Sequence, residues 1–172
     1  MNRNRWFHFP SRFNLAIVLL SLLALILPIL LALLLAPSVA EADDIVEFPD
    51  TNLEAAILEA LGKTEPPIYQ SELATLTELH ASRRNIANLS GLEYCTNLTV
   101  LDLNDNNITD LTPLASIAKL NNLWLRSNRI TSLGALSDLL NLRQLQLDNN
   151  QIGDNLLPLQ RLTNLTILLL SY

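Results

Sequence analysis

A repeat with a period of about 22 residues dominates the second half of this chain and limits what it can fold into. Leu76, Leu98, Leu120 and Leu142 are evenly spaced, and Leu165 continues the series with one extra position before it. Within the second unit, leucine, isoleucine or asparagine stands at Leu98, Leu101, Leu103, Asn106, Ile108, Leu111, Leu114 and Ile117. The third and fourth units repeat this pattern, with one residue inserted in the fourth. A fixed period of this length predicts a stack of similar units with a continuous core.

Each unit contains two leucines separated by one residue, which predicts a short strand. Because alternate residues of a strand face opposite sides, we expect Leu101 and Leu103 to point into the core and Asp102 to point outward. Successive strands should form one parallel sheet. The leucines of the return path recur at every third position, which predicts turns like those of a 3₁₀ helix. One unit cannot bury its own apolar face, so its neighbours must supply the core.

An asparagine follows the strand in three of the units, at Asn106, Asn128 and Asn150. A buried asparagine side chain can bond the backbone groups that lose their sheet partners where the chain turns. We therefore interpret this series as structural rather than ligand-binding. Arg84 occupies the same position in the first unit, which we expect to be atypical.

Residues 43–75 precede the repeats and predict a helical cap over one end of the stack. Thr51 followed by Glu54 is a capping-box pattern, Gly62 is a plausible C-cap, and Pro66 and Pro67 cannot continue a helix. The predicted buried face consists of Leu53, Ile57, Ala60 and Leu61. A second short helical turn is expected at Ser71 and Glu72.

The pattern L-x-x-L-x-L-x-x-N-x-L at this period is the leucine-rich-repeat signature, and it covers roughly residues 76–172, as four full units and a partial fifth. Together with the segment Phe48-Pro49-Asp50 and the residues 53–57 that follow, the repeat unit resembles bacterial internalin-like proteins. The expected fold is an α/β solenoid, a horseshoe with a parallel sheet on its concave face, 3₁₀-like turns on its convex face and an N-terminal helical cap. The resemblance implies a surface or secreted binding module.

Residues 1–40 have the pattern of an export signal. Three arginines stand before position 13, residues 15–36 are apolar and uncharged, and Ser38 and Ala40 are small residues suited to a cleavage site. We predict a cleaved signal peptide over residues 1–40. An uncleaved membrane anchor remains the alternative, because the apolar segment 15–36 is long enough to span a bilayer. Both alternatives export the rest of the chain to a secreted or cell-surface location.

Charge and motifs exclude several functional classes. All 17 acidic side chains of the protein lie after position 40, whereas three of its 11 Lys and Arg side chains lie before it. Nucleic-acid binding needs clustered Lys and Arg, which this balance does not provide. No motif for a nucleotide, a metal or another cofactor is present. The stretch Asp102-x-Asn104-x-Asn106 resembles the start of a calcium loop but lacks its glycine and its final glutamate.

Two further candidates for chemistry are interpreted as structural or solvated. The only cysteine, Cys95, cannot form an intrachain disulfide, and we expect it to be buried. His80 and Asp102 are predicted on adjacent strands, where a carboxylate could orient a general base. No nucleophile or enclosed pocket accompanies them, so we interpret them as solvated side chains. We therefore predict a protein that is not an enzyme and needs no cofactor.

The outward positions of the strands form rows across the predicted sheet, and these rows are the candidate binding surface. Trp124 is expected to be exposed near the middle of the sheet, with Arg126 two positions further along, and both residue types are frequent at interface hot spots. We expect a protein or glycan ligand to contact Glu78, His80, Asp102, Asn104, Asn122, Trp124, Arg126, Gln144, Gln146 and Asp148.

Two functional hypotheses follow. The first is an exported, non-catalytic protein-recognition module that binds a macromolecular partner on its concave face and meets a membrane only through an uncleaved N-terminal segment. The alternative is the N-terminal targeting fragment of a larger enzyme or surface receptor whose effector domain is absent. The fifth strand, which begins at Leu165 and stops before its asparagine turn, motivates this alternative. A cytosolic scaffold with similar repeats is disfavoured by the leader.

Overall fold

The computed structural model describes residue 24 and residues 43–171. The chain divides into two units, Met1–Ala42 and Asp43–Tyr172, and the fold below is that of the second. The predicted signal peptide or membrane anchor over residues 1–40 lies outside the described residues, apart from Ala24. Among the described residues, no helix is both long enough and apolar enough to cross a membrane.

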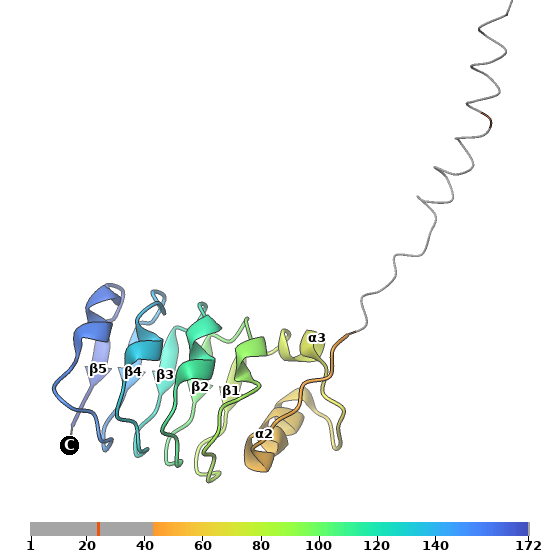
Figure 1. The fold of residues 1–172 in the computed structure, drawn as a ribbon, viewed down its shortest axis with the longest axis horizontal. Helices are drawn as coiled ribbons and strands as arrows, with labels where there is room; N and C mark the ends of the chain where they lie inside the picture. Colours follow the sequence, from red (N-terminus) through yellow and green to blue (C-terminus); the bar gives the residue numbers. More distant parts are fainter. Residues whose placement is uncertain (1–23, 25–42, 172) are drawn as a thin grey trace, which may run out of the picture. The chain divides into compact units, whose positions relative to one another are not determined.

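Five short parallel strands stack in chain order to form one sheet (Figure 1). Their bounds are β1 Glu78–His80, β2 Val100–Asp102, β3 Asn122–Trp124, β4 Gln144–Gln146 and β5 Ile167–Leu169. Equivalent residues of neighbouring units pair in register, so Leu79 lies beside Leu101 and Leu101 beside Leu123. The period of the sequence therefore sets the strand register directly, and the predicted solenoid with a parallel sheet is confirmed.

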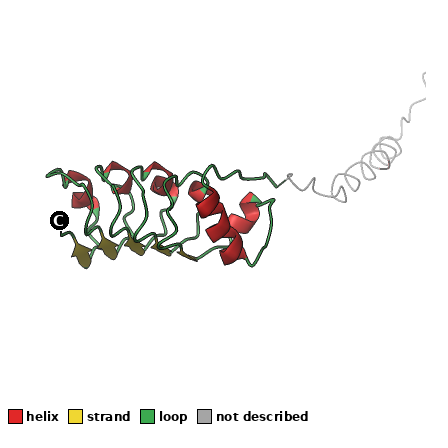
Figure 2. Cartoon of the chain, turned by 90° about the horizontal axis from the view of Figure 1, so that it is seen from below, coloured by secondary structure: helices red, strands yellow, loops and turns green. Residues whose placement is uncertain are grey.

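Short 3₁₀ helices form the side of the stack opposite the strands (Figure 2). Their bounds are η1 Leu92–Tyr94, η2 Thr112–Ser116, η3 Gly134–Leu136 and η4 Leu157–Arg161. Leucine or isoleucine at every third position brings Leu111, Leu114 and Ile117 to the same side, where all three are buried. The prediction of 3₁₀-like turns on the return path is thereby confirmed.

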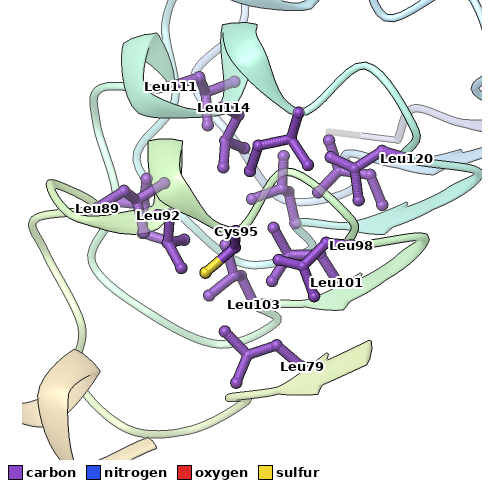
Figure 3. Close-up of a cluster of buried hydrophobic side chains, with 14 of the residues drawn as sticks. Leu79, Leu89, Leu92, Cys95, Leu98, Leu101, Leu103, Leu111, Leu114 and Leu120 are labelled. Carbon is purple, nitrogen blue, oxygen red and sulfur yellow. The ribbon is translucent and has the colours of Figure 1, made fainter. Parts of the chain in front are cut away.

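Leucines and isoleucines from both sides of each unit form one continuous core (Figure 3). Removing one such side chain from water stabilises the fold by about 1.5–3 kcal/mol. Cys95 occupies a core position, as predicted, and its surface is fully buried. Burial, with a smaller contribution from the charge of Glu93, raises the pKa of its thiol to about 12. The thiol is therefore protonated and inert at neutral pH.

The fourth unit departs from the predicted core. Leu156 is exposed and Leu159 half-buried, whereas the equivalent Leu111 and Leu114 are buried. One residue is inserted before Leu156, and η4 has no further return path packed against it within residues 43–171. Leu168 of β5 is exposed for the same reason, although it occupies an inward position.

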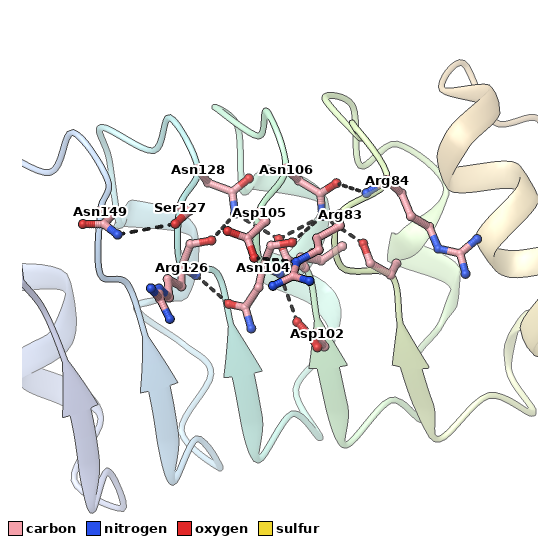
Figure 4. Close-up of polar contacts among 12 residues, drawn as sticks. Arg83, Arg84, Asp102, Asn104, Asp105, Asn106, Arg126, Ser127, Asn128 and Asn149 are labelled. Carbon is pink, nitrogen blue, oxygen red and sulfur yellow. Dashed lines mark hydrogen bonds and ion pairs between the residues drawn. The ribbon is translucent and has the colours of Figure 1, made fainter.

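The asparagine series is a ladder of hydrogen bonds between units, as predicted (Figure 4). Asn128 Nδ2 donates to the carbonyl oxygens of Leu103 at 2.9 Å and Leu125 at 3.0 Å, and its Oδ1 accepts from the backbone N–H of Ile108 at 3.0 Å. Asn106 and Asn150 make the equivalent bonds. Each side chain thus joins its own unit to the preceding one.

A second asparagine ladder, which the sequence analysis did not identify, runs along the start of the units. Asn97, Asn141 and Asn164 donate through Nδ2 to the carbonyl oxygens of Ala74, Ala118 and Leu140, respectively. Lys119 occupies this position in the third unit, and its Nζ instead donates to Asn97 Oδ1. The second ladder is therefore interrupted once.

The N-terminal cap contains the helices α2 Thr51–Leu61 and α3 Gln70–Leu73. The predicted capping box at Thr51 is wrong, because the N-cap is Asp50, whose side chain accepts from the backbone N–H groups of Asn52 and Leu53. Gly62 is the C-cap, as predicted, with a φ of 68°. The short helix predicted at Ser71 and Glu72 is confirmed as α3.

The buried face of α2 differs from the predicted one at three positions. Leu53 and Ile57 are buried as expected, together with Ala56, but Ala60 is exposed and Leu61 is half-buried. The helix packs on the end of the sheet over a narrower stripe than the apolar pattern indicated. Ala60 consequently borders a surface hollow beside β1.

Candidate binding face

The outward side chains of β1 to β5 lie in rows that cross the sheet, and we call this surface the strand face. The register places Glu78, Val100, Asn122, Gln144 and Ile167 in a first row, and His80, Asp102, Trp124, Gln146 and Leu169 in a second. Backbone hydrogen bonds continue past the strands, from Asp105 N to Arg126 O and from Ser127 N to Asp148 O. They hold together a third row, Ser82, Asn104, Arg126, Asp148 and Ser171.

Trp124 lies in the middle row, between Asp102 and Gln146 on the adjacent strands. The expectation that it would be exposed is only partly right, because the residue is half-buried. Its neighbours stand only about 4.8 Å away on either side. The indole Nε1 atom is buried, and it has no hydrogen-bond partner among the described residues. Buried indole N–H groups usually find an acceptor, so this unpaired donor is unusual.

Three of the predicted contact residues also hold the backbone in place. Asn104 Oδ1 accepts from the N–H of Arg126 at 2.8 Å, and Asp102 Oδ1 accepts from the N–H of Asn104 at 3.0 Å (Figure 4). Asp148 Oδ1 accepts from both the N–H and the hydroxyl of Ser171. Substitutions at these three positions would therefore affect the local fold as well as any contact with a partner.

The carboxamides around Trp124 have no such structural role. Asn122, Gln144 and Gln146 lie half-buried on the strand face, and the hydrogen bonds found among the described residues include none from their side chains. Each carboxamide offers two donors and one acceptor oxygen. The carboxamides beside Trp124 are therefore uncharged groups with unused hydrogen-bonding capacity.

Charged side chains gather at the cap end of the strand face. Glu78 and His80 are exposed, with 3.6 Å between Glu78 Oε2 and His80 Nε2. His80 and Asp102 are paired across the strands as predicted, but the carboxylate within ion-pair distance of the imidazole is that of Glu78. Arg126 is exposed and has no carboxylate within ion-pair distance among the described residues.

A hollow of about 270 Å³ separates α2 from β1 at this end of the strand face. Its lining residues are Ala56, Glu59, Ala60, Glu78 and His80. Arg84, which replaces the asparagine of the ladder, turns toward the cap and forms an ion pair of 2.6 Å with Glu59. Sequence reasoning missed the three lining residues on α2, because the position of a cap helix beside a sheet is not encoded in the repeat.

A metal site is not formed by the part of the chain that the structure describes, since no group of three His, Cys, Asp or Glu side chains is placed to hold an ion. The calcium-loop resemblance at Asp102-x-Asn104-x-Asn106 has a structural explanation. Asn106 Oδ1 accepts from the backbone N–H groups of Arg84 and Ile86. Its oxygen is thereby engaged in the ladder.

Comparison with protein families identifies the repeats directly. Residues 74–116 match the family model described as Leucine Rich repeats (2 copies), and residues 96–152 match the one described as Leucine rich repeat. A search of curated proteins found no significant match to this chain.

Solved structures extend the similarity to the cap. An internalin (inlF) from Listeria monocytogenes is 33% identical over 77% of this chain and 47% of its own, with a TM-score of 0.67. A leucine-rich-repeat protein from Leptospira interrogans is 28% identical over 60% of this chain and 28% of its own, with a TM-score of 0.50. The chain thus spans about half of the length of the internalin.

Proposed function

Because this chain is an internalin-like leucine-rich-repeat protein, we propose that it is an exported, non-catalytic recognition module that binds a protein partner on the strand face. The proposal rests on one observation above all. Trp124 and three unbonded carboxamides occupy the centre of a face whose composition the fold does not require. These four side chains belong neither to the leucine and isoleucine core nor to either asparagine ladder.

The chemistry of the strand face supports recognition rather than catalysis. Trp and Arg are enriched among residues that dominate binding energy. Trp124 ends β3, and Arg126 follows two positions later on the same face. His80 and Glu78 are exposed to solvent, whereas general bases act best in sites that exclude water. The ten residues predicted to contact a partner remain the proposed contact set.

Export is proposed from the leader. The arginines before position 13 and the apolar residues 15–36 are typical of a segment that directs a chain across a membrane. Intact-mass measurement of the exported protein tests this proposal. A mass that begins at Glu41, after Ala40, or at Asp43, where Ala40 and Ala42 would form a second site, supports a cleaved signal. A mass that includes Met1 indicates an anchor.

Selection of binders with the full chain tests recognition by the strand face. The probes are a displayed library of random twelve-residue peptides and a printed glycan array. We expect the wild-type chain to enrich peptides and the Trp124→Ala variant to lose them. Tyr94→Ala is the matched control, because Tyr94 is an exposed aromatic residue of η1 on the opposite side. Circular dichroism should be the same for all three proteins.

Two results would overturn this proposal. Equal enrichment by wild type and Trp124→Ala would remove Trp124 as the hot spot on which the proposal rests, and capture of glycans alone would assign a different partner class. The Trp124→Phe variant sharpens the experiment, since it keeps an aromatic ring but lacks the indole N–H. Weaker capture by this variant at unchanged stability would indicate that a partner accepts the Nε1 hydrogen bond. The alternative function, targeting of a larger enzyme or receptor, would use the same face and stays a prediction.

A further inference from the structure

We propose that the strand face is polarised, and that its partner is a polypeptide segment with a cationic side chain over β1 and β2 and an aliphatic side chain over β5, on either side of Trp124. This inference rests on the proposed function and adds the chemistry and the orientation of the partner. The inference is drawn from the charge and the solvent exposure of the outward side chains along the rows of the strand face.

The cap end of the face carries the carboxylates of Glu78 and Asp102, with His80 as the partner of Glu78. Glu78 is exposed on β1, and its contact within the described residues is His80. Asp102 on β2 uses one carboxylate oxygen for the N–H of Asn104. Two arginines lie nearby, but Arg84 is paired with Glu59, and Arg83 with Asp105. A cationic group placed beside Glu78 and Asp102 would therefore meet two carboxylates next to His80, and the exposed Arg126 lies beyond the end of β3, in the third row.

The hollow beside β1 suits the rest of such a side chain. Ala56 and Ala60 form its apolar part, and Glu59, Glu78 and His80 form its polar part. Lysine and arginine bury their alkyl stems against apolar surface while their charged ends stay beside polar groups. The hollow of about 270 Å³ thus offers both surfaces that a basic side chain needs.

The face at β5, the last strand among the described residues, is aliphatic. Ile167 and Leu169 are 42% and 43% exposed, and they occupy positions that are Gln144 and Gln146 one strand earlier. Between β2 and β5 lie the carboxamides of Asn122, Gln144 and Gln146, which can bond the N–H and C=O groups of a peptide backbone, together with the exposed Arg126. A neutral glycan has neither a cation for Glu78 and Asp102 nor an aliphatic side chain for Ile167 and Leu169. This arrangement of carboxylates at one side and aliphatic residues at the other therefore favours a polypeptide.

The spacing of the strands sets the spacing of the two anchors in the partner. From β1 to β5 there are four steps of about 4.8 Å, or about 19 Å in all. An extended chain rises about 3.3 Å per residue, so about six residues separate the two anchors if the segment is extended. This spacing defines the pattern to be sought in selected peptides.

The experiment sequences the twelve-residue peptides that the full chain enriches in a Trp124-dependent manner. We expect Lys or Arg five to seven positions from Leu, Ile, Val or Phe. Glu78→Lys should weaken binding of the best such peptide roughly three- to tenfold at low salt. Asp154→Lys is the matched control, because Asp154 is exposed and lies in the return path of the fourth unit, and it should leave binding unchanged. Ile167→Ser should reduce the preference for an aliphatic anchor.

The outcomes separate this inference from the function on which it rests. Trp124-dependent peptides without a basic residue, or with affinities that Glu78→Lys does not change, would overturn the polarised face and leave recognition intact. Absence of any Trp124-dependent peptide would overturn both. Thermal unfolding of each variant establishes that a loss of binding is not a loss of fold.

Discussion

Asp50 Oδ2 accepts a hydrogen bond of 2.7 Å from the backbone N–H of Ala87, which belongs to the first repeat. The same oxygen accepts from the N–H of Asn88 at 3.0 Å, and Oδ1 accepts from Asn52 and Leu53 at the start of α2. One carboxylate thus begins the cap helix and fixes it to the first repeat. The cap and the stack are coupled through this side chain.

Asp50→Ala should destabilise the protein by about 1–3 kcal/mol, since an N-cap and two further backbone bonds are lost. Burial raises the pKa of Asp50, but the four backbone N–H groups lower it by more, so the net pKa is lowered. The stabilisation is therefore present above the unfolded pKa of about 3.9 and is lost as pH falls through the folded pKa. Urea unfolding at several pH values measures both effects.

The difference in stability between wild type and Asp50→Ala should thus be constant near neutral pH and shrink in acid. Asp44→Ala serves as the control, because Asp44 is exposed and only its backbone carbonyl is bonded, to Gln70. A difference that persists unchanged in acid would contradict the role assigned to the Asp50 carboxylate.

Gly91→Ala should destabilise the junction of cap and repeats by about 2–4 kcal/mol. Gly91 has a φ of 102°, and a Cβ atom there would lie 2.4 Å from Cε1 of Phe48. Backbone strain at the positive φ and steric overlap with Phe48 therefore both contribute to the loss of stability. Gly153→Ala is the control, because nothing lies within 4 Å of its Cβ position, and its melting temperature should stay close to that of wild type. Phe48→Leu should partly rescue Gly91→Ala, and a failure to rescue would assign the loss to strain alone.

Asn128→Ala should cost about 1–3 kcal/mol, because it leaves backbone groups of Leu103, Leu125 and Ile108 without partners in a site that is 6% exposed. Asn128→Asp should retain the acceptor for the Ile108 N–H and lose both donors. Denaturant midpoints of the two variants measure these contributions. An unchanged midpoint for Asn128→Ala would remove the ladder as a source of stability.

Lys119→Asn should stabilise the protein by about 0.5–1.5 kcal/mol by completing the second ladder. The equivalent asparagines donate to a carbonyl at the end of the preceding return path, and Thr96 O is the corresponding acceptor here. Thermal unfolding compares Lys119→Asn with Lys119→Ala. Equal melting temperatures would show that the amide makes no useful bond at this position.

Much of this fold follows from local periodicity. The period of the repeat predicts the parallel register, because equivalent residues of similar units must pair. It also predicts the inward leucines and the buried asparagine ladder, since each position has the same surroundings in every unit. The rows of the strand face, from Glu78 to Ile167 and from His80 to Leu169, are therefore predictable as well.

Contacts between different kinds of element were not predictable. Asp50 rather than Thr51 begins α2, and Ala60 borders a hollow, because the cap lies against a sheet whose position no local pattern specifies. The second ladder was not predicted, because its asparagines lie outside the leucine pattern. All of these features depend on contacts between the cap and the first repeat or between neighbouring repeats.

By itself the sequence determined the repeat, the strand face and the residues that could contact a partner, because all three depend on spacing along the chain. Only the tertiary structure decided what those residues are free to do. Trp124 is half-buried, and its N–H has no partner within residues 43–171, where backbone groups engage Asn104 and Asp148 but not Gln144 and Gln146. The physical reason is that exposure and hydrogen bonding depend on neighbours that are a full repeat away in sequence and about 4.8 Å away in space.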